Sequence, residues 1–239
     1  MEYVYTSTEI FGILIEEPMT SLTDFITGLV GVVSYFRLQK LGFQDKAHIW
    51  FKYYFLFMGI ATLCAGVLGH ATQYVVGFNA KTIGWTFSAI ALFCLENSAL
   101  SYYQKTYDEK KLFWMRSFFL VQLIAYFIFV IYPPTRVFTL VKINAFIGMV
   151  VITLPLFYYT NQRSKTRGSW MVVLSIIASC VPGIVFSAEW SLHTYMNFHD
   201  ISHLLMAGCV YLLYRSAKQL GEENEELVIT YDSSELPAE

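Results

Sequence analysis

His199 and His203 are the residues whose type and spacing most directly suggest chemistry in this chain. They are four positions apart, a spacing that stacks two side chains on one face of an α-helix. Two imidazoles held in this way can bind one metal ion. A third histidine, His70, ends a different apolar run. Because three imidazoles and one open position form a common catalytic zinc shell, the expected cofactor is zinc, bound by His70, His199 and His203.

The elements that must position these histidines are membrane-spanning helices. The 239 residues are 56% hydrophobic and only 14% charged, whereas soluble domains carry about 25% charged residues. Apolar runs of about 20 residues, the length that spans a bilayer as a helix, recur along the chain. The net charge of −2 offers no basic surface for nucleic acid. We therefore expect an all-α polytopic membrane protein whose partner is membrane lipid; the sequence leaves the oligomeric state open.

Seven transmembrane helices are expected from these runs. All basic residues except Lys81, Arg136 and Lys142 flank alternate loops or follow the last span. By the positive-inside rule, this bias places the N-terminus outside and the C-terminus in the cytoplasm, in a plasma or bacterial inner membrane. A transmembrane domain should cover 1–220, followed by an acidic, disordered cytoplasmic tail over 221–239. The expected spans are 21–38, 50–71, 82–103, 112–132, 137–159, 169–186 and 198–214.

This orientation brings the three histidines to one membrane face. The second span runs outward, and His70 lies about 30 Å along it, near the outer end. The seventh span runs inward, and His199 and His203 lie in its first turns. The convergence of distant residues favours a metal site. The alternative is that these histidines are polar caps at the membrane interface, bonded to water or carbonyl groups.

Three carboxylates are expected at the same outer face. Asp24 lies inside an apolar helix, where an ionisable group is costly and so often functional; it could be a general base, a ligand contact or a packing hydrogen bond. Glu17 opens the same span and is a candidate to orient a ligand; the alternative is a carboxylate that only marks the entry to the helix. Asp200 is turned about 100° from the adjacent His199 along the helix, so it cannot share the metal face with both histidines. It could support a ligand on a neighbouring helix, or it could simply be a carboxylate at the helix N-terminus that the helix dipole stabilises.

Glu96 is a second catalytic candidate, placed deeper in the membrane. It lies in the third span, about 10 Å from the inner end. An ionisable residue at that depth is a functional candidate by default. The alternative is a protonated side chain bonded to Asn144 or Gln122 on neighbouring spans.

Three short motifs resemble the CREST superfamily of seven-helix membrane proteins, which includes the alkaline ceramidases and the adiponectin and progestin receptors. The entry to the first span, Glu-Pro-Met-Thr-Ser-Leu-Thr-Asp over 17–24, is similar to the ceramidase entry Glu-x-x-Asn-Thr-x-Ser-Asn. His70 ends the second span, and His199-x-x-x-His203 opens the seventh. The resemblance implies one zinc held by these histidines, amide hydrolysis on lipids and a lipid-accessible cavity. The chain also resembles a less characterised bacterial membrane family.

Two positions depart from the superfamily pattern. Gly66 stands where the superfamily usually has serine, four residues before the second-span histidine. Lys81 stands where the ceramidases carry aspartate. The resemblance implies that those residues bind the zinc water and assist proton transfer, so Asp24, Ser88 or Glu96 would have to substitute.

Three functions are compatible with these patterns. The first is a zinc-dependent intramembrane hydrolase of a lipid amide or ester, with Asp24 moving the proton. The second is a non-catalytic lipid sensor or receptor with a structural zinc. The third, a haem protein with His70 and His203 as axial ligands, fits less well, because such proteins usually place paired histidines at both membrane faces.

Overall fold

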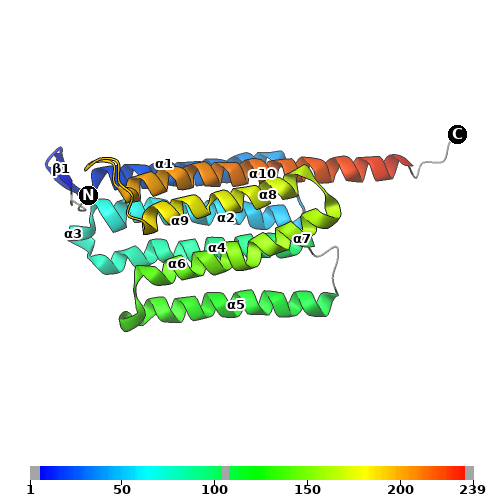
Figure 1. The fold of residues 1–239 in the computed structure, drawn as a ribbon, viewed down its shortest axis with the longest axis horizontal. Coiled ribbons are helices and arrows are strands. Elements are labelled where there is room, and N and C mark those ends of the chain that lie inside the picture. Colours follow the sequence, from blue (N-terminus) through cyan, green and yellow to red (C-terminus); the bar gives the residue numbers. More distant parts are fainter. Residues whose placement is uncertain (1–5, 104–107, 235–239) are drawn as a thin grey trace.

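The apolar runs form long helices that lie side by side along one axis (Figure 1). The protein is described by a computed structural model that covers residues 6–103 and 108–234, with the backbone alone for 226–234. A β-hairpin precedes the helices, with Ser7 paired to Glu16 and Ile10 to Ile13. The hairpin and the end of the last helix lie at opposite ends of the bundle (Figure 1). The elements are β1 (Ser7–Ile10), β2 (Ile13–Glu16), α1 (Pro18–Leu41), α2 (Lys46–Cys64), η1 (Ala65–Ala71), α3 (Gln73–Val76), η2 (Phe78–Ala80), α4 (Lys81–Tyr103), α5 (Glu109–Ile131), η4 (Pro133–Thr135), α6 (Phe138–Phe146), η5 (Ile147–Thr153), α7 (Leu154–Ser164), α8 (Arg167–Ala178), α9 (Cys180–Ser187) and α10 (Phe198–Ser234).

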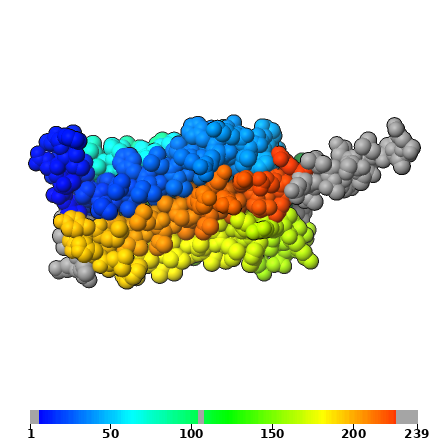
Figure 2. Space-filling model, turned by 90° about the horizontal axis from the view of Figure 1, so that it is seen from above, coloured from blue at the N-terminus to red at the C-terminus, as the bar shows by residue number. Residues whose placement is uncertain are grey.

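Six helical segments within the described residues are long and apolar enough to cross a membrane. They match the first six expected spans, so the chain is all-α and consistent with a multi-pass membrane protein. Helix α10 is not among the six, because its apolar run is short and lies between polar ends. It nevertheless packs along α1 and α8 in the same bundle, as Figure 2 shows for the face formed by α1 and α10.

The backbone is helical beyond the expected boundary at residue 221. Helix α10 continues to Ser234, and its backbone extends beyond the ends of the other helices (Figure 1). Glu223 accepts a hydrogen bond from the backbone of Gly168, while Lys218 pairs with Glu222 one turn away at 3.4 Å. These contacts and the glutamate-rich composition favour helix where we expected a disordered tail. Residues 235–239 of that expected tail lie outside the described residues.

Glycines bring α1 and α2 unusually close. A Cβ added at Gly31 would lie 2.8 Å from the Cα of Gly59, and one added at Gly59 would lie 2.9 Å from the carbonyl oxygen of Gly28. Small residues at a helix crossing allow this close backbone approach, as is common in membranes. The crossing fixes α1, which carries Asp24, against the helix that leads to His70.

Replacing Gly31 with valine is expected to destabilise the bundle. The new side chain has no space because the nearest atoms are backbone atoms of α2, so the helices must separate at a cost of about 1–3 kcal/mol. The thermal midpoint of the purified protein should fall by several degrees. Gly208→Ala is the matched control, since nothing lies within 4 Å of its added Cβ. An unchanged midpoint for Gly31→Val would contradict the close crossing.

Two spans contain a π-helical segment, η1 and η5. Such segments shift the register of a helix by a fraction of a turn and often occur at functional sites. In η1 the segment carries His70. In η5 it ends just before Pro155, which has no backbone N–H to donate, and the hydroxyl of Thr153 satisfies the Gly148 carbonyl at 2.7 Å. All four cysteines are free thiols.

Candidate metal centre

The three histidines expected to form a site lie together at one end of the bundle. The ring centroid of His70 is 6.1 Å from that of His199 and 6.1 Å from that of His203. The centroids of His199 and His203 are 6.5 Å apart. The rings therefore form a nearly equilateral triangle built from η1 and the first turns of α10. The depth of each histidine in the membrane, calculated from its position within its span, predicted that these residues, more than 120 positions apart in the sequence, would lie at the same face.

Three threonines of α1 hold α10 beside it. The Thr20 hydroxyl donates to Asp200 Oδ1 at 2.7 Å, and the Thr27 hydroxyl donates to the backbone carbonyl of His203 at 2.9 Å. Between them, Thr23 Oγ1 lies 3.4 Å from His203 Nδ1. All three threonines are buried. Their spacing of three and four residues places them on one helix face, a signal that the sequence contained and we did not use.

Asp200 caps the helix that carries the two histidines. Its Oδ2 accepts a hydrogen bond from the backbone N–H of Asn197 at 2.8 Å. In return, Asn197 Oδ1 accepts from the backbone N–H groups of His199 and Asp200. This reciprocal arrangement is a capping box. Asp200 thus fixes the start of α10 and its attachment to α1, while its support of a ligand stays a prediction.

Replacing Thr20 with valine is expected to destabilise the protein by about 1–3 kcal/mol, because a buried carboxylate oxygen loses its donor. The readout is the thermal or chemical unfolding midpoint, and Thr20→Ser should restore most of the loss. Thr86→Val is a suitable control, since the Thr86 hydroxyl bonds only the carbonyl of Thr82 in its own helix. Equal midpoints for Thr20→Val and Thr86→Val would show that the bond to Asp200 contributes nothing.

Glu17 orients His70. Its Oε2 accepts a hydrogen bond from His70 Nδ1 at 2.7 Å, which leaves Nε2 of the ring to face the centre of the site. Glu17 is buried and adopts a left-handed backbone conformation with φ 44°, a sparsely populated region for non-glycine residues. Burial alone would raise the pKa of Glu17, but the hydrogen bond and charge of His70 lower it overall, so the carboxylate is ionised. This is the supporting contact that the sequence suggested for Glu17.

Asp24 lies between two of the histidines and is only 1% exposed. Its Oδ1 is 3.4 Å from His203 Nδ1, and its Oδ2 is 3.7 Å from His70 Nε2. Within the described residues, Asp24 Oδ2 has no hydrogen-bond partner. A buried carboxylate oxygen without a donor is costly, so this atom marks a place where the protein alone is incomplete.

Gly66 and Asp24 share one space. A Cβ added at Gly66 would lie 3.1 Å from the Cβ of Asp24 and 3.0 Å from the carbonyl oxygen of Ser21. A side chain at the position where the resemblance leads one to expect serine would therefore be crowded by α1, and Ser21 and Asp24 would have to move by a few tenths of an ångström to admit it.

Lys81 borders the same site. The aliphatic part of its side chain packs over Gly69, beside His70, at 3.5 Å from an added Cβ. Its positive charge acts on Glu17 and contributes to lowering the pKa of that carboxyl. A cation therefore stands where the resemblance leads one to expect aspartate, and its charge favours the ionised form of Glu17.

The three imidazoles match zinc in ligand type, but their spacing is wider than in a ligated state. Zinc–nitrogen bonds of 2.0–2.1 Å at tetrahedral angles place imidazole centroids roughly 5 Å apart, about 1 Å closer than the observed 6.1–6.5 Å. Within the described residues, no group of three or more His, Cys, Asp or Glu side chains is placed to hold a metal ion. The unpartnered Oδ2 of Asp24, aimed at His70 Nε2, is the observation that favours a positively charged ligand or water there.

Glu96 belongs to a different polar cluster. The Gln122 amide donates to Glu96 Oε1 at 3.0 Å and to Asn144 Oδ1 at 3.3 Å. Gly148 in η5 leaves space for the carboxyl, since an added Cβ would lie 2.8 Å from Glu96 Oε1. These are the partners of the alternative reading from sequence, a buried glutamate bonded to neighbouring spans. None of its hydrogen bonds that the structure resolves joins it to the histidines.

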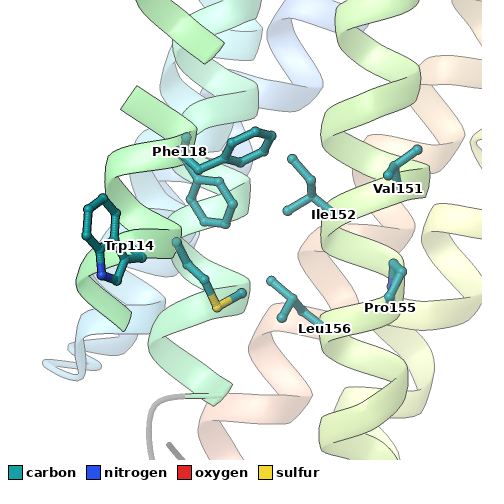
Figure 3. Close-up of a pocket in the computed structure, with 8 residues that line it drawn as sticks. Trp114, Phe118, Val151, Ile152, Pro155 and Leu156 are labelled. Atoms are coloured by element: carbon teal, nitrogen blue, oxygen red, sulfur yellow. The ribbon is translucent and has the colours of Figure 1, made fainter. Parts of the chain in front are cut away.

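The remaining histidines and an apolar groove on α5 lie away from this site. His48 bonds Asp45 and the carbonyl of Ala217, and His193 pairs with Met196 in the loop before α10. An apolar groove of about 390 Å³ lies between α5 and the η5–α7 segment (Figure 3). Its walls include Trp114, Phe118 and Pro155, and it contains no histidine or carboxylate.

The sequence profile of a family of unknown function matches residues 19–222, which include His70, His199 and His203. No curated protein and no solved structure matches the chain.

Proposed function

The chain belongs to this family of unknown function (DUF6962), and from its site we propose that it is a zinc-dependent intramembrane hydrolase acting on a lipid amide or ester. The observation that carries the proposal is the triangle of His70, His199 and His203 around the buried, incompletely bonded Asp24. The resemblance to the CREST superfamily points to the same chemistry.

We further propose that α10 is a seventh crossing and that the histidines face the outside. Helix α10 runs parallel to α1, because Thr20 meets Asp200 near their starts and Arg37 meets Tyr211 further along. A seventh crossing would leave the termini on opposite sides, with the basic loops in the cytoplasm. The site would then open toward the outer leaflet.

Each side chain has a defined task in this proposal. His70, His199 and His203 would hold zinc, and Glu17 would keep His70 in the tautomer that presents Nε2. When bound, zinc would polarise a carbonyl group and lower the pKa of a water molecule. Asp24 Oδ2 would accept the proton of the attacking water. The water oxygen bonds the carbonyl carbon, the carbon–nitrogen or carbon–oxygen ester bond breaks, and Asp24 returns the proton to the leaving amine or alcohol.

A structural zinc in a lipid sensor is the second candidate. It is favoured by Gly66 and Lys81, which remove the hydroxyl and the carboxylate that the resemblance would lead one to expect. A sensor would bind zinc and lipid without releasing product.

Incubation of purified protein with a panel of lipid amides and esters tests the proposal. We expect product release that stops when a chelator removes zinc and resumes when zinc is added back, with mass spectrometry of the lipids as the readout. Zinc retention without product from any substrate would favour the sensor. Product release that is indifferent to chelation would contradict a zinc-dependent reaction.

A further inference from the structure

A second lipid-facing groove lies along the seam between α1 and α10, toward the end opposite the histidines. It encloses about 250 Å³, and its apolar wall includes Leu29 and Val33 of α1. Tyr211 and Tyr214 of α10 form the other wall. Leu29 and Val33 are 57% and 45% exposed, so the groove is open to the surrounding membrane.

Cationic side chains close one end of this groove. Arg37 lines it directly, and Arg215 Nη1 donates to the Tyr211 hydroxyl at 3.4 Å. Arg37 lies 19 residues after the start of α1, about 28 Å along the helix, which is the depth of the membrane–water interface. An apolar slot thus ends, at headgroup depth, in two guanidinium groups and a phenol.

We propose that this groove binds an anionic phospholipid of the leaflet opposite the histidines. The phosphate contacts Arg37, Arg215 and the Tyr211 hydroxyl, and an acyl chain lies along Leu29 and Val33. Guanidinium groups suit phosphate oxygens because they donate several hydrogen bonds in one plane. The proposal does not depend on the metal site.

The groove in Figure 3 is a useful comparison, because it differs from the groove between α1 and α10 in the charge of its lining. It is larger, and its lining contains no charged side chain. The acyl chain of any phospholipid could lie in this groove, whatever the charge of its headgroup. Of these two grooves, only the one between α1 and α10 has a charged side chain, Arg37, in an otherwise apolar lining. Charge complementarity therefore selects an anionic headgroup there.

Native mass spectrometry of the purified full chain with phosphatidylglycerol or phosphatidylcholine tests this site. We expect the wild type to retain phosphatidylglycerol roughly tenfold better, since each basic residue near the surface contributes to attraction of anionic lipid. The double variant Arg37→Gln, Arg215→Gln should lose this preference. Lys40→Gln and Arg163→Gln, which remove charges outside the groove, should keep it.

A second pair of variants tests the apolar wall. Val33→Trp fills the slot and should lower retention of phosphatidylglycerol, whereas Phe36→Trp, on the same helix but outside the groove lining, should not. Unchanged thermal midpoints establish that each variant is folded. Equal retention of both lipids by the wild type, or a preference that survives the double arginine substitution, would overturn the proposal. Conversion of a dimer to a monomer by Val33→Trp would overturn it too, by making a second copy the occupant.

Discussion

Replacement of Asp24 with asparagine is expected to lower the turnover of lipid substrate by about 10²–10⁴-fold, the usual contribution of a positioned proton-transfer group. Asparagine has nearly the same shape but cannot accept the proton. Because Asp24 lies 3.4 Å and 3.7 Å from His203 and His70, the substitution leaves all three imidazoles in place. Zinc content should therefore stay near that of the wild type while turnover falls.

Glu96→Gln is the matched control for this experiment. Glu96 is also a carboxyl only 1% exposed, but its resolved hydrogen bonds lead to Gln122 on α5. Its amide variant should change turnover by no more than a few-fold. A loss in Glu96→Gln as large as that in Asp24→Asn would return Glu96 to the catalytic role suggested by its position in the sequence and would remove the assignment to Asp24.

Replacement of Glu17 with glutamine is expected to weaken zinc binding by about 10–100-fold, the range found when a carboxylate that supports a ligating histidine is removed. The ionised Glu17 accepts a hydrogen bond from His70 Nδ1 at 2.7 Å, and glutamine is a weaker, uncharged acceptor. Competition with a chromogenic chelator measures the change. The adjacent Glu16 provides a control, because its carboxylate accepts from the backbone of Tyr74 and not from His70. Equal zinc affinity in Glu17→Gln and Glu16→Gln would exclude this role.

The helical bundle and the convergence of the histidines were accessible from sequence for one physical reason. A helix that crosses a membrane has a fixed rise per residue, so residue number within a span gives depth. That rule placed His70 level with His203, although it says nothing about which helices are neighbours. It also located Glu96 away from the site, where Gln122 was correctly anticipated as a partner.

Other features depended on packing that depth does not specify. The side chain of Asp24 fills the space left at Gly66 because α1 crosses the η1 segment closely, and no spacing rule relates two residues on different helices. Asp200 was assigned two roles from its position, and the capping box that it forms with Asn197 was not among them. The tail was predicted to be disordered because of its acidic charge, although the pair Lys218–Glu222, four residues apart, also supports a helix.

The central claim is that His70, His199 and His203 together hold one zinc ion, and elemental analysis of purified protein tests it most directly. We predict about one zinc per wild-type chain, less than a tenth of that in His203→Ala, and a wild-type level in His193→Ala, whose imidazole lies in the loop before α10. Equal zinc in the wild type and in His203→Ala, or none in the wild type after zinc is supplied, would contradict the claim.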